Sequence, residues 1–227
     1  MKKFVVCCFL LFVFHSWAYS QNYEDAGLWT TVNVEKKLKN NFSVFFTEEF
    51  RLKENFSRIN LFYTDAGVSL RPYSFLKLAF AYRFVQKYQI DDTYSFRHRL
   101  IFDVTLRRTV GSTALSYRHR LQSEVRDVQS SEKGGIPEWY SRNKAEVKYD
   151  LQKKYTPFAS LEFRYQFRSP YNVESDRTWH NYRAALGVEY ELNKKNIIGL
   201  YYLIQREWNV SRPDNLYIVG IEYSLTL

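Results

Sequence analysis

The stretch that decides the fold runs from Tyr94 to Arg126 and reads YSFRHRLIFDVTLRRTVGSTALSYRHRLQSEVR. Apolar and polar residues alternate along two segments, and the residues RTVGS form a turn between them. Because a strand places successive side chains on opposite faces, this alternation predicts a hairpin with one apolar face and one ionic face. The apolar set is Phe96, His98, Leu100, Phe102, Val104, Leu106, Leu115, Tyr117, His119, Leu121 and Val125, and the ionic set is Arg97, Arg99, Asp103, Arg107, Ser116, Arg118, Arg120, Gln122, Glu124 and Arg126.

Each of these predicted strands is about 14 residues long, against a mean of about 5–6 residues in soluble domains. A tilted membrane-spanning strand needs about 9–11 residues, so the length fits a span with a short overhang. Eleven alternating segments follow one another, at residues 27–37, 42–53, 59–71, 74–88, 93–107, 112–127, 139–151, 156–169, 178–192, 196–208 and 215–227. No helical pattern and no Pro/Gly/Ser-rich linker separates them, which predicts one domain over residues 21–227.

The first twenty residues have the pattern of an export signal peptide. The basic pair Lys2-Lys3 precedes an apolar run from Phe4 to Phe14 that is too short for a membrane-spanning helix. Small residues in Ala18-Tyr19-Ser20 stand where signal peptidase reads the chain, so we expect cleavage after Ser20. Both cysteines, Cys7 and Cys8, lie in the apolar run, so the mature chain has no disulfide and no thiolate metal site.

The composition favours a membrane barrel over a soluble protein. Aromatic residues make up 19% of the chain and charged residues 25%, and no later segment approaches 18 consecutive apolar residues. High aromatic content, high charge and strict alternation together are typical of a barrel with a lipid-facing skin and a polar interior. The alternative is a soluble secreted barrel or sandwich whose charged face points outward and whose apolar core holds a small ligand. Without Lys2 and Lys3 there are 31 basic residues against 24 acidic ones, and we assign this charge of about +7 to lumen and loops rather than to nucleic-acid binding.

The connections between the segments alternate between two kinds. KLKNN, RPYS, RTVGS, QKKYT and ELNKKN are tight turns, whereas ENFSR, QIDDT, VQSSEKGGIPEW, SPYNVESDRT and NVSRPDN are longer or richer in loop residues. Bacterial outer-membrane barrels have short periplasmic turns and longer external loops, so we expect the tight turns at the periplasmic end. Eleven strands would leave the start of the first strand outside. Because bacterial single-chain barrels have even strand numbers, we favour ten or twelve strands, with a short extra strand near residues 22–26 as one solution.

The ionic phase of the segments predicts a charge network in the lumen. Arginine suits such a site because its planar fork pairs carboxylates bidentately and keeps its charge. The network has two interpretations, a structural set of ion pairs that fills the interior or an arginine-lined path that selects anions. Its members are Glu49, Arg51, Arg83, Arg97, Arg99, Asp103, Arg118, Arg120, Glu124, Arg142, Glu146, Glu162, Arg164, Arg183, Glu189 and Glu222.

The histidines raise the question of an enzyme. Barrels that deacylate lipids need a Ser/His pair with an acid or amide at the lipid-facing rim. His98, His119 and His180 all fall on the apolar phase, whereas Ser95 and Ser116 fall on the other. No short His-x-Ser element, metal constellation or phosphate-binding Gly loop is present, so we expect no enzymatic activity, no metal and no cofactor.

Several loose patterns resemble an uncharacterised family of predicted outer-membrane proteins from Bacteroidetes and relatives, domain of unknown function 2490. They are Trp29 before a first strand, Glu48-Glu49-Phe50-Arg51, Arg97-His98-Arg99-Leu100, Tyr117-Arg118-His119-Arg120-Leu121, Asn181-Tyr182-Arg183 with Gly187 beyond, and Gly199-Leu200-Tyr201-Tyr202. The resemblance covers most of the mature chain. It implies an outer-membrane barrel and brings no established activity or catalytic residues.

The sequence thus predicts an all-β fold, an antiparallel up-and-down transmembrane β-barrel of about 10–12 strands, exported by the Sec route to a Gram-negative outer membrane. The expected partners are outer-membrane lipids and the assembly machinery, since the strand at Asn215 to Leu227 ends on its apolar phase like a C-terminal assembly signal, with Leu where an aromatic residue is usual. The function follows in outline only: a structural or interaction protein or a narrow, porin-like pore for small anionic solutes. The alternatives are a lipid-modifying hydrolase and the soluble ligand-binding barrel. The solute, the state of the lumen and the oligomeric state do not follow from the residues.

Overall fold

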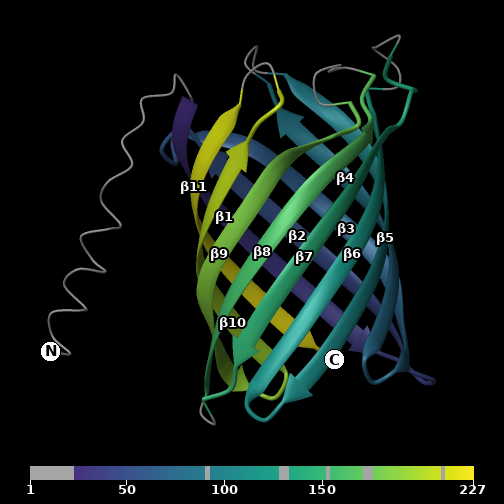
Figure 1. Cartoon of the computed structure of the whole chain (residues 1–227), viewed down its shortest axis with the longest axis vertical. Coiled ribbons are helices and arrows are strands. Elements are labelled where there is room, and N and C mark those ends of the chain that lie inside the picture. Colours follow the sequence, from purple (N-terminus) through teal and green to yellow (C-terminus); the bar gives the residue numbers. More distant parts are fainter. Residues whose placement is uncertain (1–22, 90–92, 128–132, 152–153, 171–175, 211–212) are drawn as a thin grey trace, which may run out of the picture.

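The computed structural model describes residues 23–89, 93–127, 133–151, 154–170, 176–210 and 213–227. The expected signal peptide and parts of five connections lie outside these residues. The described strands are β1 (Tyr23–Lys37), β2 (Phe42–Lys53), β3 (Arg58–Tyr73), β4 (Leu76–Tyr88), β5 (Tyr94–Val110), β6 (Thr113–Arg126), β7 (Glu138–Tyr149), β8 (Tyr155–Arg168), β9 (Thr178–Asn193), β10 (Asn196–Glu207) and β11 (Asp214–Thr226). They follow the eleven alternating segments closely, and they form one wall of tilted strands around a central axis (Figure 1).

The sheet closes on itself, so the predicted barrel is confirmed. Each strand from β1 to β11 pairs antiparallel with its neighbour in the chain, and β1 pairs parallel with β11. The preference for ten or twelve strands is wrong, because the described residues form eleven strands and the parallel pair closes the ring without a twelfth. Tyr23 to Ala26 do not make a separate strand but begin β1, where they pair with Asp214 to Tyr217.

The two faces of the wall follow the period-two pattern. In β5, Leu100 and Phe102 are 51% and 44% exposed, whereas Ile101 between them is 2% exposed and points inward. Large apolar side chains cover the outer surface of most strands, which is typical of a lipid-facing skin. The soluble alternative required the opposite arrangement, with the charged face outward, and the structure contradicts it. No helix among the described residues is both long and apolar enough to cross a membrane.

The interior is polar but contains two small apolar clusters. One consists of Trp29, Leu203 and Ile218, and the other of Leu61, Tyr63 and Val85. Next to the first cluster the ring of Tyr201 lies over Gly220, where any side chain would overlap the ring. A glycine in a strand often marks such a close approach. These aromatic groups narrow the lumen beside the charged residues described next.

Candidate functional site

All sixteen residues of the predicted charge network lie on the inner side of the barrel. An internal cavity of about 590 Å³ is lined by twelve of them: Glu49, Arg51, Arg83, Asp103, Arg118, Arg120, Arg142, Glu146, Glu162, Arg183, Glu189 and Glu222. The other four, Arg97, Arg99, Glu124 and Arg164, take part in buried polar contacts nearer the long loops. Nine basic and eight acidic side chains line the cavity in total, so charge alone does not make it strongly positive.

The mouth at the tight-turn end is basic. A second cavity of about 640 Å³ opens there, and we call it the vestibule. Its charged lining consists of five basic residues and one acid: Arg71, Lys77, Arg107, Arg108, Lys148 and Glu146. Lys77, Lys148 and Glu146 also line the 590 Å³ cavity, so the two spaces adjoin. An anion that reaches this end of the barrel meets a positive entrance.

Halfway along the lumen, arginines outnumber the acids that they pair with. Glu162 on β8 accepts hydrogen bonds from Arg142 Nη2 at 2.5 Å and Arg118 Nη2 at 2.8 Å. Arg183 Nη1 lies 3.6 Å from the same carboxylate. Next to this group, Arg120 donates two bonds of 2.7 Å to Asp103. We call these six residues the arginine belt, in which four guanidinium groups share two carboxylates.

Two other arginines of the cavity each pair with a single acid. Arg83 donates to Asp65 at 2.5 and 2.6 Å across β3 and β4, and its guanidinium carbon lies 3.6 Å from the Tyr63 ring centroid. Arg51 pairs with Glu49 and lies 3.5 Å from the Trp29 ring centroid. Such bidentate and stacked arrangements hold an arginine more rigidly than a single contact would. The sequence prediction missed Asp65, although its position on the inward phase of 59–71 was a usable signal.

A second group lies toward the long-loop end of the interior, and we call it the long-loop cluster: Arg97, Arg99, Glu124, Arg126 and Glu138. Glu124 pairs with Arg97 and Arg126 at 3.0 Å and also with Arg99, while Arg126 Nη2 lies 2.5 Å from Glu138. Glu124 and Glu138 are each 1% exposed. None of the five lines either interior cavity. These ion pairs therefore lie in the interior beyond the two cavities, toward the long-loop end.

The predicted outward position of His180 is wrong. The pairing of β8 with β9 shifts register between Arg164 and Tyr165, which adds a residue to β9. Such a bulge reverses the alternation, so His180 and Asn181 are both buried while Trp179 remains exposed outside. Arg164 Nε donates to His180 Nε2 at 2.6 Å. The side chain thus belongs to the polar interior.

The other two histidines lie on the outer face, as the sequence predicts. His98 Nδ1 lies 2.5 Å from the hydroxyl of Tyr82. His119 Nδ1 lies 2.8 Å from Asn143 Oδ1, and Asn143 also donates to the buried hydroxyl of Ser141 at 3.2 Å. Among the described residues, the hydrogen-bond partners of these two rings are Tyr82 and Asn143 rather than a serine hydroxyl. Groups of three or more His, Cys, Asp or Glu that could hold a metal ion are likewise absent from these residues.

Comparisons with known proteins agree with the barrel. The model of a family described as "Protein of unknown function (DUF2490)" matches residues 26–216. The chain is similar in structure to the NanC porin, with a TM-score of 0.55 and 11% identity over 89% of this chain and 98% of that one. It is also similar to a bacterial polysaccharide outer membrane secretin, with a TM-score of 0.54 and 12% identity over 84% of this chain and 67% of that one. At these identities the likeness concerns the fold, which is that of outer-membrane porins. The curated proteins contain no match.

Proposed function

Since the chain belongs to the DUF2490 family of proteins of unknown function, we propose from its interior that it is a narrow outer-membrane channel for small anions. The observation that carries the proposal is the arginine belt, where Glu162 is shared by three arginines and four guanidinium groups meet two carboxylates. A small anion such as chloride, phosphate or a carboxylate would be attracted by the excess positive charge there.

The basic vestibule also favours anions over cations. Clefts lined by charge of one sign raise the local concentration of the opposite ion. Five basic groups against one acid would therefore gather anions at the tight-turn mouth before they reach the belt. A solute that moves on must cross the long-loop cluster, so transport requires Glu124 and its arginines to part. The expected conductance is accordingly small.

A second candidate is a barrel with a permanently closed lumen and a structural or interaction role. The near-complete burial of Glu124 and Glu138 favours it, because such ion pairs fill the lumen and exclude water. Neither candidate requires catalysis, and a non-enzymatic role fits the porin-like fold.

The remaining parts of the proposal concern export. Residues 1–20 would be removed as a signal peptide after Ser20, leaving residues 21–227 as the barrel domain. The C-terminal strand would carry the signal for the outer-membrane assembly machinery. Fractionation of cell membranes, with boiled and unboiled samples compared on gels, tests the location, since a folded barrel shifts in mobility on heating.

Planar-bilayer recording of the purified protein tests the channel. In a KCl gradient we expect small conductance steps with a reversal potential that indicates anion preference. Arg118→Gln and Arg142→Gln together should reduce that preference, whereas Lys195→Gln, at an exposed turn, should not change it. A folded protein with no conductance would favour the closed barrel, and a cation preference would contradict the anion proposal outright.

A further inference from the structure

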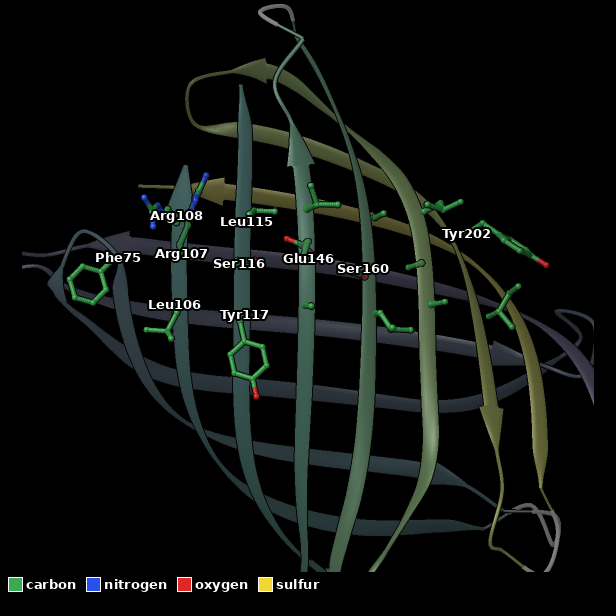
Figure 2. A pocket seen from close by; sticks show the side chains of 18 residues that line it. Phe75, Leu106, Arg107, Arg108, Leu115, Ser116, Tyr117, Glu146, Ser160 and Tyr202 are labelled. Carbon is green, nitrogen blue, oxygen red and sulfur yellow. The ribbon is translucent and has the colours of Figure 1, made fainter. Parts of the chain in front are cut away.

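The outer wall carries a hollow of about 1210 Å³ that the proposed channel does not use. It crosses β5 to β10 along two rows of paired residues (Figure 2). The first row runs Leu106, Tyr117, Ala145, Leu161, Ala184 and Ile204, and the second runs Arg108, Leu115, Val147, Ala159, Leu186 and Tyr202. Figure 2 shows Arg108 and Leu115 toward one end of the hollow and Tyr202 at the other.

Three small side chains make this part of the wall recede. Ala145, Ala159 and Ala184 stand on the outer face of three adjacent strands, where large apolar residues are the rule. Each lies between bulkier neighbours in its row, such as Leu161 and Leu186, the latter 68% exposed. The result is a surface groove whose floor is lined by alanine methyl groups and whose sides are aliphatic and aromatic side chains. An extended hydrocarbon chain fits such a shape.

One end of the hollow is cationic. Arg107 and Arg108 line both the hollow and the vestibule, so they stand on the rim where the two meet. Both are exposed, and no ion pair joins either of them to another described residue. Guanidinium groups bind phosphate bidentately. Arg108 belongs to the outer row of the hollow, and Arg107 beside it, on the inner phase of β5, borders the hollow at the rim. A ligand that satisfies both features has an anionic head and a long apolar tail.

The length of the hollow agrees with one lipid tail. Five strand spacings of about 4.8 Å give about 24 Å between β5 and β10 along the row. One leaflet of the hydrocarbon core is about 15 Å thick, half of the whole core, and a path that climbs obliquely with the tilted strands is longer than that. The hollow starts near the end of β5 at the tight-turn rim and reaches the middle of β10, so it runs from the headgroup level into the core.

We propose that this hollow binds a phospholipid with an anionic headgroup, with its phosphate at Arg107 and Arg108 and one acyl chain over Ala145, Ala159 and Ala184. The proposal rests on the barrel lying in the membrane and does not depend on anion conduction. The lipid comes from the leaflet at the tight-turn end, which is the phospholipid leaflet when that end faces the periplasm. Because the same two arginines line the vestibule, a bound headgroup also lowers the positive charge at the mouth.

Native mass spectrometry of the folded protein in a neutral detergent tests the site, with phosphatidylglycerol and phosphatidylcholine offered in equal amounts. We expect phosphatidylglycerol to be retained over phosphatidylcholine, and Arg108→Gln to reduce that preference about fivefold. Ala159→Phe, which fills the floor, should abolish retention of both lipids. The matched controls are Lys37→Gln, an exposed base at the same end, and Ala66→Phe, an outward alanine away from the hollow, and both should bind as the parent does.

The heat-dependent mobility shift checks that each variant is folded, and if Ala159→Phe fails to fold, Arg108→Gln alone decides. Equal retention of the two lipids overturns the proposal, as does a preference that Arg108→Gln leaves unchanged. A lipid-free dimer that Ala159→Phe dissociates overturns it as well, because a second copy would then occupy the hollow. Loss of conductance would leave these results intact, so the lipid site and the channel fail separately.

Discussion

Replacing Glu162 by glutamine tests how far the lumen charges hold the barrel together. The carboxylate is 7% exposed and accepts three hydrogen bonds, two from Arg142 and one from Arg118, with Arg183 near by. Glutamine keeps the shape but removes the charge that three guanidinium groups share. Removing one partner of a buried ion pair costs about 3–5 kcal/mol, because the remaining charges stay buried without compensation. The side chain of Arg118 is 27% exposed, so water screens part of this loss and we expect about 3 kcal/mol.

Urea unfolding of the barrel in lipid vesicles, followed by tryptophan fluorescence and by gel mobility, measures this loss. Glu189→Gln is the matched control, since its partner Lys148 lies 2.5 Å away and both side chains are 29% exposed. Such a solvent-accessible pair contributes about 0–1 kcal/mol. Equal losses in the two variants would refute the reasoning that the arginine belt is a buried electrostatic unit. In bilayers, Glu162→Gln should also strengthen anion preference, and a shift toward cations would contradict the role given to the belt.

Two further predictions concern the faces and the closure of the barrel. Leu161→Arg, on the outer face in the middle of β8, should lower the free energy of unfolding by about 2–4 kcal/mol. Arg164→Leu should lower it less, because the partner of Arg164 is His180 rather than a carboxylate. Urea unfolding compares the two variants, and the reverse order would mean that the outer face is not in lipid. Leu28→Cys and Val219→Cys, which are paired across β1 and β11, should form a disulfide. Leu28→Cys and Leu225→Cys should not, because position 225 lies about 20 Å further along the strand than position 219. Non-reducing gels detect the difference, and a first pair that forms no disulfide would argue against parallel closure.

The faces of the strands were predictable because alternation is a local property of the chain. In the hairpin of β5 and β6, the segments around Phe102 and Leu121 pair directly, with Asp103 opposite Arg120 on the inner side. Nothing outside the two segments is needed to see that one face is apolar and the other ionic. The same period continues through the nine other described strands, so the sixteen residues of the charge network could be predicted from it, whereas Asp65 was missed and His180 was assigned to the wrong face.

The error at His180 has a physical cause that the pattern does not contain. Counting by twos from Tyr182 places His180 on the outer face, but the bulge opposite Arg164 and Tyr165 adds one residue and reverses the phase. No glycine or proline marks the position, since the local sequence is Thr178-Trp179-His180-Asn181. A bulge of this kind is set by how two strands fit together, and a single strand does not reveal it.

The partners within the lumen were beyond the sequence for a related reason. Arg118 and Glu162 are 44 residues apart and stand on β6 and β8, with β7 between them. Their contact depends on the register of two strand pairs and on long side chains that reach across a strand. The composition of the ionic face therefore indicated a network, but not that one carboxylate would serve three arginines.

The odd strand number follows from the same hydrogen-bond geometry that makes barrels stable in lipid. A sheet of eleven strands joined by hairpins has first and last strands that run in the same direction, so its two edges meet only as a parallel pair. Open edges in hydrocarbon leave backbone groups unpaired at several kcal/mol each, whereas parallel pairing is only slightly weaker than antiparallel pairing. The β1–β11 pair has thirteen residues in register, and the amide of Lys37 and the carbonyl of Leu227 continue it by a 3.0 Å bond. Closure is therefore the physical requirement, and an even number of strands is only its most frequent solution.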